Sequence, residues 1–313
     1  MYHLGIDIGG TNLKFGILNK KFELISDFSY KMPHLVDLYT IKTALIDSIA
    51  KIAIDYQLSS IGIGAPGIVD DSGLIVVSPN IPAFNGFNLL NFLKESIHDH
   101  LRKDIPIKIE NDANIAAIAE MTLGIGADLI NFVYITLGTG VGGAIILNRQ
   151  LFRGNHGSAG EIGHIIFNSN ANTKKREYRT GVLEEYLGKN AVINYAKRIA
   201  HKFPDSVLNN NKKFDVISIS DYADEGDELA IYCMEKMGYY LGITITSVAN
   251  LLDINHFIIG GGISKSSVLF YKKAMEVANK RVLPHLQNKI VIEKAKFSSK
   301  AGIIGSAIFG AMK

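Results

Sequence analysis

Two aspartates stand where apolar segments of the sequence break off, and they are the first candidates for chemistry. Asp7 ends the apolar start of the chain and is followed by the glycines of DIGGT, the hydroxyl of Thr11 and the amine of Lys14. A glycine turn between two strands can leave backbone N–H groups in an anion-binding concavity. A carboxylate beside bound phosphates makes chemical sense when a divalent cation lies between them. The alternative is a plain hairpin turn with a solvated carboxylate.

The second aspartate, Asp112, lies in ENDAN, between a predicted strand and a predicted helix. Open α/β sheets bind ligands at the carboxyl ends of their strands. A carboxylate there can act as a general base that accepts the proton of a hydroxyl during phosphoryl transfer. The structural alternative is that Asp112 is a helix N-cap, a common place for Asp. The residues alone leave both open.

The first glycine turn recurs later in the chain. Residues 132–149 mirror residues 3–20, so that Asp7 corresponds to Thr136 and Gly9 to Gly138. A looser similarity relates residues 61–68 to residues 257–264. Chance similarity between apolar, glycine-rich strands is one explanation. The other is a pair of related lobes, each of which supplies a phosphate-facing hairpin to one cleft.

The pattern GxGxxG occurs twice, at residues 62–67 and 138–143. In dinucleotide-binding proteins this motif opens a helix, whereas here IVDDSG follows the first copy and the strand-like AIILN follows the second. We therefore reject a Rossmann dehydrogenase. The sequence has no GxxxxGK[ST] motif, which excludes a P-loop nucleotidase.

Strands alternate with helices along the chain, which predicts an α/β protein. Short apolar runs predict strands over residues 2–8, 13–18, 60–64 and 105–109. Apolar residues at helical spacing, together with turn signals, predict helices over residues 35–56, 87–102, 113–123, 183–203, 228–251, 267–283 and 301–311.

Composition narrows the class of protein. The chain has 313 residues, of which 47% are hydrophobic and 20% charged, and a formal net charge of +3. At roughly 100–200 residues per domain, two domains are expected. The small net charge gives no reason to expect a nucleic-acid or membrane partner. The single cysteine, Cys233, fits a reducing compartment, and without a targeting segment a cytoplasmic location is expected.

DIGGT, GAPG, ENDAN, TLGTGVGG, GSAGEIGH and IGGG follow one another in this order across essentially the whole chain. In this combination the sequence resembles the ROK family of sugar kinases and sugar-responsive repressors. The resemblance implies an α/β, two-lobed ribonuclease-H-like fold of the actin/hexokinase superfamily, with ATP and a sugar in an interlobe active-site cleft. It implies an N-terminal α/β lobe at 1–115, on which a C-terminal helix at 301–313 packs back, and a C-terminal α/β lobe at 116–300.

The resemblance also implies a role for each matched residue. Asp112 is the catalytic base, and Asp7 holds Mg²⁺ through water. The ATP-binding residues are Asp7, Gly9, Gly10 and Thr11 with Lys14 beside them, then Thr136, Gly138, Thr139 and Gly140, and on the adenosine side Gly260, Gly261 and Gly262. The sugar-binding residues are Asn80, Asn111, Asp112, Glu161, His164 and Glu184. Without the family, Glu161 and His164 would also fit a solvated loop.

The sequence departs from the family where many members carry a zinc site. Lys175, Glu177 and Val182 occupy the three cysteine positions, and His164 is left without thiolate partners. A structural zinc needs four ligands, typically thiolates and imidazoles, so no structural zinc is expected. The repressor branch carries a helix-turn-helix before the first hairpin, and only six residues precede Asp7 here, which argues against direct DNA binding.

The expected function is therefore an ATP- and Mg²⁺-dependent sugar kinase that acts on a primary C6 hydroxyl. N-acetylmannosamine is narrowly preferred as the substrate over glucose, fructose or a β-glucoside. The alternative is a catalytically silent sugar-binding regulator, and Asp112 favours the enzyme because a sensor needs no base. The expected partner is a small-molecule sugar, and the family tendency is a homodimer.

Overall fold

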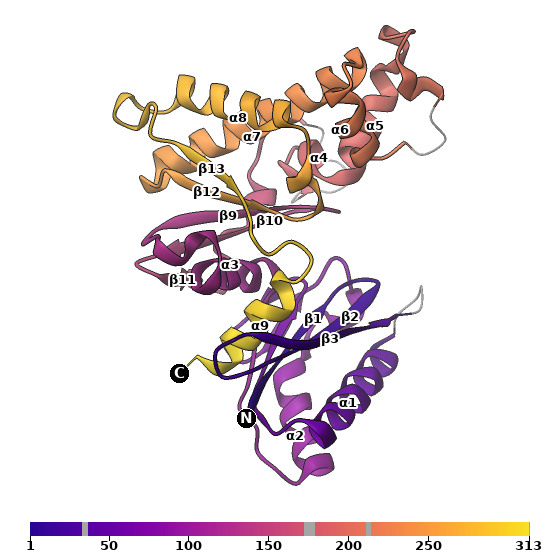
Figure 1. Cartoon of the computed structure of the whole chain (residues 1–313), viewed down its shortest axis with the longest axis vertical. Helices are drawn as coiled ribbons and strands as arrows, with labels where there is room; N and C mark the ends of the chain where they lie inside the picture. Colours follow the sequence, from indigo (N-terminus) through magenta and orange to yellow (C-terminus); the bar gives the residue numbers. More distant parts are fainter. Residues whose placement is uncertain (33–36, 172–178, 211–213, 313) are drawn as a thin grey trace. The chain divides into compact units, whose positions relative to one another are not determined.

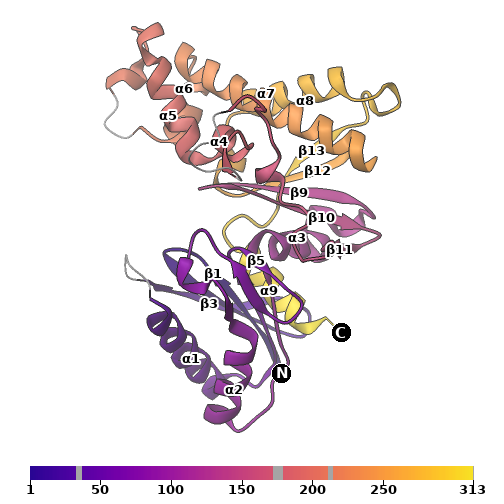
Figure 2. The same cartoon turned by 180° about the vertical axis from the view of Figure 1, so that it is seen from behind.

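The chain folds into two compact units, shown in Figure 1 and, from behind, in Figure 2. The computed structural model describes residues 1–32, 37–171, 179–210 and 214–312. The first unit comprises Met1–Asp128, Leu151–Ala159 and Ser299–Lys313, and the second comprises Leu129–Gln150 and Gly160–Ser298. The lobe boundary expected at residue 115 falls inside α3 (Asp112–Leu123), a helix of the first unit.

Two sheets share one strand order. The first runs β3-β2-β1-β4-β8, from Leu24–Lys31, Asn12–Leu18, Tyr2–Ile8, Leu58–Ala65 and Ile107–Asn111. The second runs β11-β10-β9-β12-β13, from Gln150–Phe152, Val141–Leu147, Phe132–Leu137, His256–Gly260 and Val291–Lys294. In each sheet an antiparallel hairpin is continued by parallel strands. Because β1–β2 and β9–β10 hold equivalent places, as do β4 and β12, the predicted internal repeat is confirmed.

Neither copy of GxGxxG opens a helix. The first is followed by β5 (Ile68–Val69), which pairs with β6 (Leu74–Val77) and, through it, with β7 (Phe87–Asn88) in a small sheet. The second ends inside β10. The prediction that no helix follows either glycine motif is therefore confirmed.

The helices agree with the sequence pattern except in the second unit. The first unit contains α1 (Leu38–Asp55), α2 (Leu89–Leu101), α3 and α9 (Ala301–Ala311), and the second contains α4 (Glu184–Leu187), α5 (Lys189–Ile199), α6 (Val216–Asp224), α7 (Glu228–Leu252) and α8 (Val268–Arg281). The single helix predicted over 183–203 is interrupted because Gly188 is extended. The elements that were not predicted are the strands β3, β5, β6, β7, β11 and β13 and the helix α6.

Glycines in two central strands let the C-terminal helix lie against the sheet backbone. A Cβ on Gly5 of β1 would overlap the carbonyl oxygen of Ile303, and one on Gly62 of β4 would overlap that of Ser306. Larger residues would push α9 away. This close approach explains why the last helix packs on the first strands of the chain.

The alternation of β1 decides which way its aspartate points. Leu4, Ile6 and Ile8 are buried in the core that also contains α1 and α2 residues. Successive side chains of a strand face opposite sides of the sheet. Gly5 and Asp7 therefore lie on the face that carries α9.

The second unit has its own core. Val133, Ile135 and Leu137 of β9 pack with residues of α5 to α8, so Tyr134 and Thr136 lie on the other face of that sheet. Among the described residues, no helix is both long and apolar enough to span a membrane.

Candidate active site

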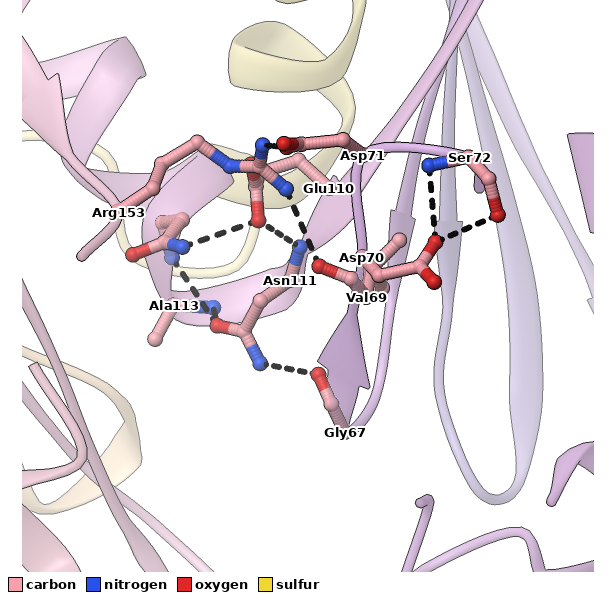
Figure 3. Close-up of polar contacts among 10 residues, drawn as sticks. Gly67, Val69, Asp70, Asp71, Ser72, Glu110, Asn111, Ala113 and Arg153 are labelled. Carbon is pink, nitrogen blue, oxygen red and sulfur yellow. Dashed lines mark hydrogen bonds and ion pairs between the residues drawn. The ribbon is translucent and has the colours of Figure 1, made fainter. Parts of the chain in front are cut away.

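Asn111, and not Asp112, is the N-cap of α3. Its Oδ1 accepts hydrogen bonds from the N–H groups of Ala113, at 2.8 Å, and Asn114, at 3.2 Å. Its Nδ2 donates to the carbonyl oxygen of Gly67 at 2.9 Å (Figure 3). The cap interpretation of Asp112 is therefore wrong.

Asp112 is the first residue of α3 and is exposed. Its Oδ1 accepts from the N–H of Ala113 at 2.9 Å, and its carboxyl group lies at the positive end of the helix dipole. Because β1, β4 and β8 are parallel, their carboxyl ends meet at one edge of the sheet. Asp7, near the end of β1, and Asp112, directly after β8, therefore belong to the edge where such sheets bind ligands.

The first hairpin holds Asp7 tightly from two sides. The Nζ of Lys14 lies 3.3 Å from its Oδ2 across the β1–β2 pair, and the Asp7 side chain is 17% exposed. On the other side, a Cβ on Gly302 of α9 would come within 2.5 Å of the Asp7 carboxyl carbon. Lys14, matched above to the phosphates, is thus also the ion-pair partner of Asp7. The solvated-carboxylate interpretation of Asp7 does not fit this partly buried, paired side chain.

The tip of the same hairpin is open. The N–H of Gly9 donates to the carbonyl oxygen of Asn12 at 2.9 Å and closes the turn. Gly10 and Thr11 are exposed, and the nearest atom to a Cβ built on Gly10 is the carbonyl oxygen of Asn80, 3.9 Å away. The structure therefore brings Asn80 next to the glycine turn, and leaves room there for a ligand.

The second hairpin, β9–β10, is fixed to the start of α5. The N–H of Gly138 donates to the carbonyl oxygen of Gly140 at 3.0 Å, and the carbonyl oxygen of Gly138 accepts from the N–H of Lys189 at 2.9 Å. This last bond explains the break at Gly188: α5 begins where its first N–H reaches the glycine turn. The turn also follows Thr136, near the end of β9.

A pocket of about 490 Å³ in the second unit joins the glycine turn to the loop after β12. Gly138 and Thr139 line it from one side and Gly262 from the other, with Lys189 and Lys265 at its wall. Its volume lies in the range of small-molecule sites, roughly 300–1,000 Å³. Its lining balances the two lysines with Asp215 and Asp221, so the open glycine backbone, and not a net positive charge, is the feature that suits a phosphate-bearing ligand.

The three glycines of IGGG do different things. A Cβ on Gly260 would overlap the hydroxyl of Tyr134, and one on Gly261, whose φ is +81°, would overlap the carbonyl oxygen of Leu137. Both glycines are thus required for packing against β9. Gly262, like Gly138, has nothing within 4 Å of a built Cβ, so it is the member of this group that borders the pocket.

Glu161 directly precedes a 3₁₀ turn, Ile162–His164, and His164 is the last residue of that turn. Glu161 Oε2 lies 3.9 Å from His164 Nε2, and the two side chains are 35% and 34% exposed. Burial raises the pKa of Glu161; the carboxylate of Glu184 adds to this, while His164 and Arg179 oppose it. The Nδ1 atom of His164 is buried and has no hydrogen-bond partner among the described residues.

Glu184 supports the second hairpin directly. Its Oε2 accepts from the N–H of Val141 at 3.1 Å, its Oε1 pairs with Arg179, and a Cβ on Gly140 would overlap its carboxylate. Asn111 likewise supports the fold, because its side chain caps α3 and donates to the Gly67 carbonyl oxygen. One hydrogen of its amide group remains for another partner. Both residues matched to sugar binding are therefore also part of the framework of the site.

Sequence reasoning missed two charged residues of this region: Glu110, the first residue of ENDAN, and Arg153. Glu110 is fully buried, and Arg153 approaches it from a segment distant in sequence (Figure 3). The available signal for Glu110 was a charged residue at the end of an otherwise apolar strand. This signal does not identify the residue that pairs with Glu110.

Lys175 and Glu177, which stand at the zinc-cysteine positions, lie outside the described residues. Val182 is buried. Within the part of the chain that the structure describes, no group of three or more His, Cys, Asp or Glu residues could hold a metal ion. The absence of zinc stays a prediction.

The paired sheets define a fold of the actin/hexokinase kind, and the comparisons agree with this. The model of the ROK family matches residues 3–311. The chain therefore belongs to the ROK family.

Its relatives in that family include kinases and repressors. A glucokinase of Halalkalibacterium halodurans is 31% identical over 97% of this chain and 93% of its own length. A xylose repressor of Bacillus spizizenii is 26% identical over 97% of this chain and 75% of the repressor. A ROK family glucokinase from Streptomyces griseus, solved in complex with glucose and AMPPNP, is 27% identical, covers 99% of both chains and superposes with a TM-score of 0.81.

Proposed function

We propose that this chain is an ATP-dependent kinase that transfers the γ-phosphate to the primary C6 hydroxyl of a hexose or N-acylhexosamine. The observation that carries the proposal is the state of Asp112. It is an exposed carboxylate at the ligand-binding edge of the first sheet, and Asn111 has already taken the cap role. A regulator that only binds sugar has no chemical need for a base at this place.

Asp112 acts on the sugar hydroxyl. A hydroxyl that attacks a phosphorus atom must lose its proton, and a carboxylate within hydrogen-bond reach can orient the hydroxyl and accept that proton. The oxygen forms its bond to the γ-phosphorus while the bond to the β-bridging oxygen breaks, and ADP leaves. The rest of catalysis is positioning and neutralisation of charge.

The nucleotide is assigned to the glycine turns. The pocket beside Gly138, Thr139 and Gly262 suits the adenosine and phosphate groups, and the open tip at Gly10 offers backbone N–H groups to phosphate. Mg²⁺ commonly uses one or two carboxylates plus substrate phosphates and water, and the partly exposed Asp7 fits that need. When bound, Mg²⁺ neutralises charge on the phosphates.

The sugar is assigned to Glu161, His164 and Glu184 in the second unit and to Asn80 and Asn111 in the first. Planar carboxylates and imidazoles pair adjacent hydroxyls, and a site built to hydrogen-bond hydroxyls rejects analogues that lack them. N-acetylmannosamine is the sequence-based preference. The 31% identical relative is a glucokinase, so glucose is the direct competitor.

A coupled ADP-release assay over a sugar panel tests the proposal. We expect turnover with one or more of N-acetylmannosamine, N-acetylglucosamine, glucose, fructose and a β-glucoside. The second candidate, a silent sugar-binding regulator, is suggested by the related xylose repressor. Sugar binding in calorimetry without ADP release from any of these sugars would favour the regulator.

A further inference from the structure

Arg153 lies in a short excursion of the chain. Residues Leu151–Ala159 belong to the first unit, although the segments immediately before and after them belong to the second. Arg153 holds this excursion through contacts within the first unit.

The guanidinium of Arg153 joins three segments of the first unit (Figure 3). Its Nε lies 2.7 Å from Oε2 of Glu110, at the end of β8. Its Nη2 donates to the carbonyl oxygen of Val69, in β5, at 3.1 Å, and its Nη1 pairs with Asp71 in the following turn. A planar fork of donors can make these bonds at once, whereas a lysine ammonium cannot.

Glu110 connects the contacts of Arg153 to the start of α3. It is 0% exposed, and its Oε1 accepts from the N–H of Asn111 at 2.7 Å and from Nδ2 of Asn114 at 3.0 Å. Burial alone would lower the pKa of Arg153, but the charge of Glu110 and the contacts with Asp71 together outweigh burial and raise it. Oε1 of the buried carboxylate is thus held by hydrogen bonds from the start of α3, and Oε2 faces the guanidinium of Arg153 as an ion pair.

We propose that Arg153 and Glu110 are positioning residues that set the place of Asp112, a role that rests on the proposed kinase function. Glu110 is fully buried, and Arg153 acts through it. Glu110 holds the N–H of Asn111, Asn111 holds the first turn of α3 and the Gly67 carbonyl, and Asp112 is the next residue in the chain. Misplacement of a catalytic group by about 1 Å can cost about 100-fold in rate.

Two variants separate positioning from simple stabilisation. Arg153→Lys keeps the charge and loses the fork. Removing one charge alone strands the other in the interior and can prevent folding, so the second variant is the double Glu110→Gln/Arg153→Met, which removes both. The matched control is Lys273→Gln, which breaks an ion pair with Glu276 on the surface of α8.

We expect both variants to fold, with kcat lowered about 10- to 100-fold and the KM values for sugar and ATP changed less than about twofold. Amide hydrogen exchange at residues 111–114 should accelerate, because the N–H of Asn111 and the helix cap are less firmly held. Lys273→Gln should change none of these quantities.

Wild-type kcat in the folded double variant overturns the proposal, even if exchange accelerates, because the pair would then be structural only. Unchanged exchange at residues 111–114 in both variants also overturns it. If the wild-type chain turns over no sugar in the panel, the proposed kinase function fails by itself. Hydrogen exchange then still decides whether Arg153 holds the start of α3.

Discussion

Replacing Asp112 with Asn separates its chemistry from its place in the fold. The change preserves size and the acceptor oxygen for the N–H of Ala113, and the cap of α3 is intact because Asn111 supplies it. The loss of the favourable interaction between one exposed carboxylate and the helix dipole costs about 0.3–1 kcal/mol. The variant should therefore fold and melt close to the wild type.

The kinetic loss should be far larger. Removing a general base typically costs about 10²- to 10⁴-fold in rate, which corresponds to about 2.7–5.5 kcal/mol of transition-state stabilisation. We expect kcat in the coupled ADP-release assay to fall by this factor, while calorimetry shows sugar and nucleotide binding close to wild type. The fall should affect kcat because the proton is transferred only in the transition state.

Asp37 provides the matched control. It is an exposed aspartate at the start of α1 in the same unit, and its side chain accepts from the N–H of Thr40 at 2.7 Å. Asp37→Asn should leave kcat unchanged. Near wild-type turnover in a folded Asp112→Asn preparation would refute the base assignment and leave Asp112 as an exposed residue of the first turn of α3.

Three further predictions concern other parts of the site. Gly138→Val should weaken ATP binding at least about tenfold by calorimetry, because the new side chain borders the pocket. The melting temperature should change little, because a Cβ at this position has nothing within 4 Å. Unchanged ATP affinity would remove the nucleotide assignment. Elemental analysis of the purified protein should find no stoichiometric zinc, and chelators should not lower its melting temperature; one zinc per chain would contradict this. Burial raises the pKa of Glu161, so ionisation of this carboxyl group destabilises the folded chain. The stability is at its full value below the ordinary pKa of Glu and is lost as pH rises through the raised pKa. Glu161→Gln should therefore gain stability relative to the wild type between pH 4 and pH 8 in thermal unfolding, and a constant difference over that range would show that the pKa is not raised.

Local patterns in the sequence were enough for the repeated part of the fold. Strand, glycine turn and strand are encoded within residues 3–20 and again within 132–149, so both hairpins were predicted before any contact was known. The helical spacing of apolar residues in α1, α7 and α8 likewise predicted helices. Asp7 and Asp112 were identified because each follows a predicted strand.

Only the tertiary structure separated residues with the same local pattern. Asn111 and Asp112 are both good caps, and the choice depends on Gly67, whose carbonyl holds the Asn111 amide. Gly260, Gly261 and Gly262 read alike in sequence, but β9 crowds the first two and leaves the third beside the pocket.

The pairing of Arg153 with Glu110 was beyond the sequence for the same reason. Periodicity and turn chemistry act over a few residues, whereas a buried ion pair depends on which distant segments the fold brings into contact. The chain alone placed the glycine turns and the two aspartates at strand ends. Packing decided which neighbouring polar groups are committed to the framework and which remain available to a ligand.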